Sequence, residues 1–144
     1  MTDLPSLTAT LTEFPPSANR MYIRTRRGTI LSKEARKFKA DALVQLLKEW
    51  MFSPKLEKHL PYKLTLRFYF PKVENSGWPK KAKNRFVKRD VSNLIKVLED
   101  VVAQATGVDD SNTTEVVVYK KLDVDNPRIE IEFCGLPEDS WKKA

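Results

Sequence analysis

The residues best suited to chemistry lie in the segment KRDVSNLIKVLEDVVAQATGVDDSN, residues 88–112. Asp90 stands before a run of helical periodicity, and the pair Asp109-Asp110 follows that run after a glycine. Carboxylate oxygens are the ligands that Mg²⁺ prefers, and two or three of them can hold ions that polarise a phosphodiester and generate a hydroxide for attack. A nearby lysine such as Lys96 would stabilise the charge that grows on the phosphate. The segment therefore indicates metal-assisted phosphodiester chemistry.

A helix over residues 91–105 would position these groups. At about 100° per residue, Asn93, Lys96 and Asp100 share a polar arc of about 60°. A helix of about 15 residues is about 22 Å long, so the acidic turn begins at the end far from Asp90. The spacing alone leaves open whether the two acidic positions meet. The apolar residues fall on another arc, which is the predicted core face: Val91, Leu94, Ile95, Leu98, Val101, Val102 and Ala105.

Each of these groups also has a plainer structural interpretation. Asp90 is well placed to be the N-cap of the helix, and Asp109-Asp110 is typical of a polar turn. Lys96 and Asp100 are spaced as an i,i+4 pair on a solvated helix face. The chemical interpretation is favoured because these features occur together, next to a strongly basic segment.

A basic loop, residues 71–89, precedes this helix. It holds seven basic residues and one acidic residue, whereas the whole chain carries a net charge of +7, so the rest of the chain is close to neutral. Its cations would neutralise the phosphates of a nucleic acid, or would serve only solubility. Trp78 and Phe86 lie among the lysines and would either stack on exposed bases or pack the loop. The predicted nucleic-acid contacts in this loop are Lys80, Lys81, Lys83, Arg85, Lys88 and Arg89.

The composition excludes several other kinds of chemistry. With one histidine, His59, and one cysteine, Cys134, the chain lacks the residues for a zinc finger, a Cys/His zinc site or an internal disulfide. Four glycines and the absence of a GxxxxGK[ST] pattern argue against a P-loop or a dinucleotide fold. No apolar run is long enough to cross a membrane, and the first residues do not resemble a secretory signal, so we expect a cytoplasmic protein.

The patterning of apolar residues predicts one α+β domain over residues 1–136 and a polar C-terminal tail over residues 137–144. The expected architecture is a mixed β-sheet packed against two main helices. The link Asp125-Asn126-Pro127 predicts a hairpin turn between the last two strands. Alternation and helical periodicity predict strands at 6–14, 22–24, 29–31, 62–70, 113–124 and 128–133, and helices at 33–51, with Ser32 as its N-cap, and at 91–105.

In the order of its motifs, the chain resembles the RusA family of Holliday junction resolvases. The motif Pro15–Arg20, a glycine-containing hairpin and a helix that opens with Ser-x-Glu come first, and a strand that ends in Lys120 comes last. Between them lies the signature R-D-x-x-N-L-x-K-x-x-x-D, followed by a glycine and Asp-Asp-Ser. It is formed by Arg89, Asp90, Asn93, Leu94, Lys96, Asp100, Gly107, Asp109, Asp110 and Ser111.

The resemblance implies a small homodimer that binds four-way DNA junctions and nicks them symmetrically with Mg²⁺, with Mn²⁺ as an alternative ion. It implies that Asp90 and Asp110 are catalytic carboxylates and metal ligands, and that Lys96 is the catalytic lysine. Further DNA contacts are assigned to residues in the matched motifs: Asn19, Arg20, Asn93 and Lys120. The loop Pro15–Arg20 would either line the DNA surface or order the dimer.

One position departs from the family pattern, which often has a second aspartate in the form D-x-D-N. Here that position is Ser92. The missing carboxylate would weaken metal binding, although the serine hydroxyl can still ligate and Asp109 or Asp100 can compensate. We therefore expect an endodeoxyribonuclease of DNA recombination and repair. The alternatives are a non-catalytic or weakly catalytic branched-DNA-binding protein of the same fold, and a basic interaction module for RNA or protein whose acidic residues are dispersed in space.

Overall fold

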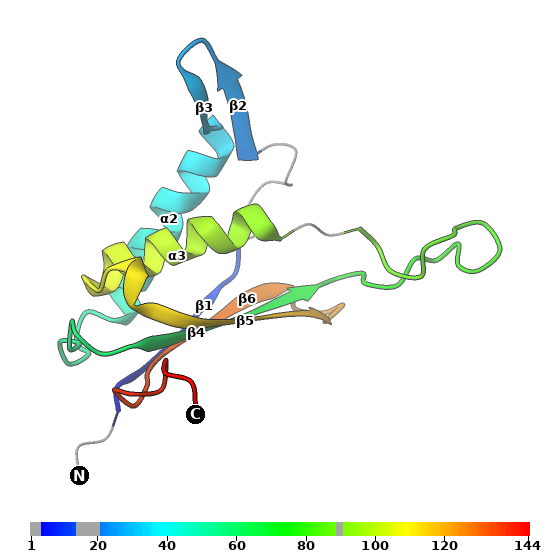
Figure 1. Cartoon of the computed structure of the whole chain (residues 1–144). Coiled ribbons are helices and arrows are strands. Elements are labelled where there is room, and N and C mark those ends of the chain that lie inside the picture. The colour runs from blue at the N-terminus through cyan, green and yellow to red at the C-terminus, as the bar shows by residue number, and fades with distance from the viewer. Residues whose placement is uncertain (1–3, 14–20, 89–90) are drawn as a thin grey trace.

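The computed structural model describes residues 4–13, 21–88 and 91–144. A four-stranded sheet carries both long helices on one face, and a two-stranded hairpin and the basic loop project from this body (Figure 1). The predicted α+β class is confirmed. In the described part of the chain, no helix is long and apolar enough to cross a membrane. The elements are β1 (Ser6–Leu11), β2 (Tyr22–Thr25), β3 (Gly28–Leu31), α2 (Lys33–Glu49), β4 (Tyr62–Phe70), α3 (Ser92–Thr106), the 3-10 turn η1 (Asp110–Asn112), β5 (Thr113–Leu122) and β6 (Arg128–Gly135).

The main sheet has the strand order β1-β6-β4-β5. β5 runs parallel to β4, and the other neighbours are antiparallel. The inner strands supply most of the sheet's core, and the ring of Tyr62 on β4 stacks on the ring of Phe133 on β6 with their centroids 4.6 Å apart. The hydrophobic side chains that these two strands bury are Tyr62, Leu64, Leu66, Phe68 and Phe70 from β4, and Ile129, Ile131 and Phe133 from β6.

The predicted hairpin between the last two strands is wrong. β4 lies between β5 and β6, so the link at residues 123–127 crosses the end of β4 instead of joining neighbouring strands. Turn chemistry is local and does not specify which strands pair. Burial does specify it here: β6 buries alternate side chains and takes an inner place, whereas most of β5 is exposed at the edge of the sheet.

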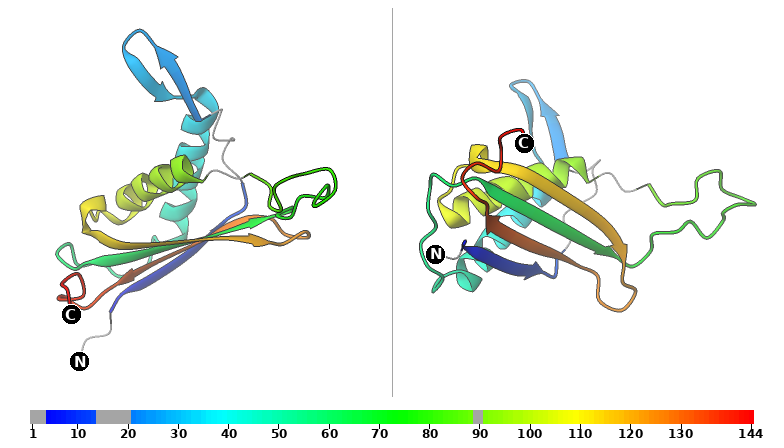
Figure 2. Two further views of the ribbon diagram at one scale, coloured as in Figure 1. Left: turned by 45° about the vertical axis from the view of Figure 1, so that its right-hand side comes forward. Right: turned by 60° about the horizontal axis from the view of Figure 1, so that its bottom comes forward.

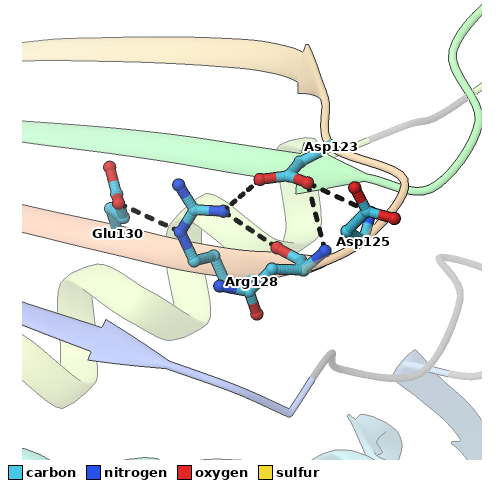
Figure 3. A network of polar contacts seen from close by, with 5 residues as sticks. Asp123, Asp125, Arg128 and Glu130 are labelled. Atoms are coloured by element: carbon cyan, nitrogen blue, oxygen red, sulfur yellow. Dashed lines mark hydrogen bonds and ion pairs between the residues drawn. The ribbon is translucent and has the colours of Figure 1, made fainter.

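Arg128 holds this crossing in place (Figure 3). Its guanidinium donates to the carboxylate of Asp123 at 2.7 Å and to that of Glu130 at 3.1 Å. It also lies 3.9 Å from the centroid of the Tyr69 ring. The N–H of Asp123 donates to the carbonyl of Phe70 at 2.9 Å, which attaches the link to the end of β4. The hydrogen bond from Arg128 lowers the pKa of Asp123, so the aspartate stays ionised as an acceptor.

Both helices have the amphipathic faces that the sequence predicts. α2 begins after Ser32, whose hydroxyl accepts a hydrogen bond from the N–H of Ala35 at 3.1 Å, as expected of an N-cap. α3 buries most of the predicted apolar arc and Val97 as well, whereas Ile95 and Ala105 of that arc are partly buried. It begins at Ser92 with Val91 in the N-cap position. The predicted N-cap, Asp90, lies outside the described residues.

The C-terminal end of α3 is set by Gly107. This residue has a left-handed backbone with φ of 74°, and its N–H donates to the carbonyl of Ala103 at 2.9 Å. Glycine suits this conformation because it has no Cβ to clash with the backbone. Val108 follows in the core with 1% of its surface exposed. The glycine and the buried valine together fix where the chain turns back toward Asp110.

We expect Gly107→Ala to lower the free energy of unfolding by about 1 kcal/mol, because an alanine adopts a left-handed backbone at a cost of that order. Urea denaturation followed by circular dichroism measures the change. Gln104→Ala, at an exposed position of the same helix, is the control and should change stability by less than about 0.5 kcal/mol. A Gly107→Ala variant as stable as this control would contradict the role given to the glycine.

Candidate active site

Four of the predicted site residues lie outside the described residues: Asn19, Arg20, Arg89 and Asp90. The structure does describe the helix that follows Asp90 and the turn that carries Asp110. The approach of these two carboxylates therefore stays a prediction. The remaining site residues are placed by α3, η1, β5 and the basic loop.

One face of α3 presents a hydroxyl, an amine and a carboxylate in a row. Ser92, Lys96 and Glu99 are separated by four and three residues, which is the spacing of neighbours on one helix face. Ser92 and Lys96 are exposed, and Glu99 is half-buried. At a rise of about 1.5 Å per residue, this row is about 10 Å long. It therefore runs from the N-terminal end of α3 to the middle of the helix.

The turn η1 brings Asp110 back to this part of α3. The turn is held by Asn112, whose side-chain amide donates to the carbonyls of Lys58 at 2.7 Å and Leu60 at 3.0 Å. Both carbonyls belong to the backbone just before β4, and β5 then starts beside β4. η1 also packs against α3. Asp110 is thus attached to the sheet on one side and lies against the helix on the other.

Asp109 acts as the cap of this turn. Its carboxylate accepts a hydrogen bond from the N–H of Ser111 at 3.1 Å and a second one from the Ser111 hydroxyl, both on the same oxygen. These bonds lower the pKa of Asp109, because they stabilise its ionised form. One carboxylate oxygen of Asp109 is therefore engaged within the turn. Asp110, the other acidic residue of the pair, is exposed.

Glu99 and Asp110 lie close enough for their charges to interact. Burial is the main cause that raises the pKa of Glu99, and the negative charges of Asp110 and Asp100 raise it further, while Lys96 opposes the shift. Two neighbouring carboxylates repel each other when both are ionised. A cation bound between them would reduce this repulsion.

The residues of the predicted polar arc of α3 do not all face the same surroundings. The carboxylate of Asp100 lies 3.6 Å from the ammonium of Lys39, so Asp100 joins α3 to α2. The i,i+4 ion pair between Lys96 and Asp100 is not formed within the described structure. Glu99, which the sequence interpretation missed, takes the place beside Lys96 instead. Its spacing of three residues from Lys96 was the signal that would have identified it.

The described donors suit a hard divalent cation. Asp110 and Glu99 offer carboxylate oxygens and Ser92 offers a hydroxyl, which are ligands typical of Mg²⁺ and Mn²⁺ sites. Within the residues that the structure describes, no three acidic, histidine or cysteine side chains are grouped closely enough to hold a metal. The donor set thus fits the metal in chemical type, and its completion requires water or a ligand from the undescribed part of the chain, where Asp90 lies.

The basic loop is a narrow projection in its described part, residues 71–88. Backbone hydrogen bonds join residues 73–75 to residues 85–87, and the chain between them forms the tip. Figures 1 and 2 show that the loop extends beyond the end of the sheet. Of the described residues predicted to contact nucleic acid, Asn93 is half-buried and the following are exposed: Lys80, Lys81, Lys83, Arg85, Lys88 and Lys120.

Arg85 differs from these lysines because contacts within the loop hold it. Its guanidinium donates to the carboxylate of Glu74 at 3.0 Å. It also lies 4.9 Å from the ring centroid of Trp78 and 5.4 Å from that of Phe86. Trp78 and Phe86 therefore help to pack the loop, although they stay 39% and 57% exposed. A ring that is both packed on one side and exposed on the other keeps a surface on which a base can stack.

Comparison with known proteins places the chain among DNA-cleaving enzymes. The family described as Endodeoxyribonuclease RusA matches residues 13–133 of the 144 residues. The matched range includes α3, η1 and the basic loop. A search of curated proteins found no match.

Metal-free Glu99→Gln protein should be more stable than the wild type at pH 7 and equally stable at about pH 3.5. Because the folded state raises the pKa of Glu99, ionised Glu99 destabilises the fold. This penalty is absent below the ordinary pKa of a glutamate and grows as the pH rises above it. Thermal unfolding in EDTA at both pH values measures the difference.

The control for this experiment is Glu138→Gln, at an exposed position in the C-terminal segment. It removes the same charge away from Asp110 and should leave stability unchanged at both pH values. If Glu99→Gln gave no gain at pH 7, ionised Glu99 would not destabilise the fold, and the combined effect of burial and of the neighbouring negative charges would be contradicted.

Proposed function

The chain belongs to the endodeoxyribonuclease RusA family, and from this we propose that it resolves four-way DNA junctions by paired, Mg²⁺-dependent nicks. It acts in DNA recombination and repair as a homodimer with one active site in each subunit. The observation that carries the proposal is that the family match includes both α3 and η1, the two elements that gather Lys96, Glu99 and Asp110. The interaction-module hypothesis differs in expecting that Asp90 and Asp110 lie apart and that Asp110→Asn changes nothing measurable.

The acidic residues are proposed to hold the metal. Asp90 and Asp110 are the principal ligands. The Ser92 hydroxyl and the Asp109 oxygen that accepts no hydrogen bond within the described residues are further donors. Glu99 is the described carboxylate best placed to offset the one that is missing at Ser92, because the other candidate on α3 is paired with α2. When bound, Mg²⁺ or Mn²⁺ polarises the scissile phosphate and lowers the pKa of a coordinated water.

Lys96 is the proposed catalytic lysine. It is exposed and lies one helical turn from both Ser92 and Glu99, so its ammonium stands beside the oxygens that would hold the metal. A phosphate bound there gains negative charge as the attacking oxygen adds to phosphorus. The ammonium stabilises that charge, and this stabilisation is greater in the transition state than in the bound substrate.

Paired nicks require two active sites that act on strands of the same junction. A homodimer provides these two sites, and the exposed lysines of each basic loop neutralise phosphates near them. Each phosphate contact releases counter-ions from the DNA, so binding should weaken steeply with salt. The loop thereby supplies affinity, while the carboxylates and Lys96 supply the reaction.

A second candidate function is branched-DNA binding with little or no cleavage. Ser92 favours it, because a hydroxyl at this position contributes no charge to a metal site that an aspartate would strengthen. The second candidate keeps the fold, the basic loop and the junction specificity. It differs from the first only in the rate of strand cleavage.

Asp110→Asn should lower the rate of junction cleavage by more than about 100-fold, because even groups that only support a metal ligand are worth about 10-fold to 100-fold. The measurement follows a labelled four-way junction in Mg²⁺, Mn²⁺ or EDTA, and binding is measured separately in EDTA. Asp139→Asn, at an exposed C-terminal position, is the matched control and should cleave like the wild type. Loss of binding together with cleavage would count against a metal-ligand role for Asp110.

Ser92→Asp should lower the Mg²⁺ concentration needed for half-maximal cleavage by about tenfold, because it adds an acidic ligand to the site. A titration of cleavage rate with Mg²⁺ measures this change. If the wild type binds junctions without nicking them and Ser92→Asp restores paired nicks, the second candidate describes the natural protein. If Ser92→Asp leaves the Mg²⁺ dependence unchanged, position 92 is not part of the metal site.

A further inference from the structure

A second basic segment lies outside the basic loop. Residues 21–37 hold six basic residues and one acidic residue, Glu34. The net charge of the chain outside the basic loop is nevertheless close to zero, because an excess of acidic residues after residue 90 offsets the positive charge of this segment. The segment comprises the hairpin β2–β3 and the first turns of α2. Its basic residues are Arg24, Arg26, Arg27, Lys33, Arg36 and Lys37.

The hairpin places three of these cations far from the body of the protein. It projects from the N-terminal end of α2, and its two strands pair only with each other in the described structure (Figure 1). Arg26 and Arg27 form its tip, where the Thr25 hydroxyl donates to the carbonyl of Gly28 at 2.8 Å. Arg24 stands beside the tip on β2. All three arginines are exposed.

The start of α2 continues the same surface. α2 turns Ala35 and Phe38 into the core, so Lys33, Arg36 and Lys37 lie on its exposed side. These three residues and the three hairpin arginines are exposed cations on two adjoining elements, and we call this set the hairpin surface. Within the described residues, none of its six cations forms an ion pair with a carboxylate. Arg85 of the basic loop, by contrast, is already paired with Glu74.

The hairpin surface and the basic loop leave the body in different directions (Figures 1 and 2). In these views the N-terminal end of α3 lies in the angle between them. Ser92 and Lys96 belong to this end of the helix. A nucleic acid that met both projections would therefore pass close to the candidate active site.

We propose that the hairpin surface binds the sugar-phosphate backbone of a DNA duplex arm, while the basic loop holds a different arm of the same junction. The inference rests on the proposed function in taking branched DNA as the ligand. The arginines, which form no ion pair with a carboxylate within the described residues, match the charge of phosphates, and the hairpin presents them at the end of a two-stranded projection. Two projections that point in different directions can each contact one arm of a branched DNA. A straight duplex would contact only one of them.

The test compares DNA binding by wild type and a triple variant, Arg24→Gln, Arg26→Gln and Arg27→Gln. Fluorescence anisotropy in EDTA over a range of salt concentrations excludes cleavage from the readout. We expect junction affinity to fall by at least about tenfold at 0.1 M salt, with the slope of log affinity against log salt reduced by about two to three, one for each lost phosphate contact. A linear duplex of the same length should lose less.

The matched control is Lys48→Gln, Lys55→Gln and Lys58→Gln, which removes three exposed cations from the opposite end of α2 and the segment after it. Replacement of the three arginines by lysine should preserve affinity and thus separate charge from fold. Thermal unfolding and sedimentation verify that each variant is folded and keeps the wild-type oligomeric state.

If the arginine-to-glutamine variant bound the junction as tightly as the Lys48, Lys55 and Lys58 control variant, the inference would be overturned and the proposed function would stay intact. A variant that changes only the oligomeric state would also overturn it, in favour of a second copy as the partner of this surface. If wild type itself fails to bind a junction, the proposed function fails first and this inference fails with it.

Discussion

The candidate site depends on the parallel pairing of β5 with β4. Parallel neighbours must start from the same end of the sheet, so the chain between them has to travel back along the whole sheet. α3 makes this return, which places its C-terminal half beside the start of β5. For this reason Asp110, at the end of the return, comes near enough to Glu99 in the middle of the helix for its negative charge to raise the pKa of Glu99. Strand direction thus brings together two acidic residues from different elements.

Most of the elements could be predicted from sequence because they follow from local periodicity. The hairpin at Gly28, the cap at Ser32 and the alternation in β4 were each predicted where the structure has them. The order of the strands could not be predicted in the same way. The Asp-Asn-Pro link describes a turn but does not say that β4 lies between the strands it connects, since that depends on burial across the whole sheet.

The candidate site was inferred from a motif and from angles on a helix. Lys96 and Asp110 were named from the motif, and the structure describes Lys96 on α3 and Asp110 on the turn η1 that follows it, while their roles stay a prediction. Asp100 was assigned to the polar arc by its angle on the helix, but Lys39 on α2 attracts it away. Glu99 was missed because its role depends on the residues that lie near it in space. Its acidic neighbour Asp110 belongs to another element, η1, which helix periodicity does not place. Pairwise contacts of this kind are set by packing between elements.

The place of β6 in the sheet affects how the protein is made. β6 follows the other described strands in the chain, yet it lies at the centre and is the neighbour of both β1 and β4. Among the described strands, β1 pairs with β6 alone. During synthesis β1 therefore emerges long before its partner, and the sheet closes only when residues 128–135 leave the ribosome. Until then the nascent chain exposes unpaired strand edges, which are sites for chaperone binding or aggregation.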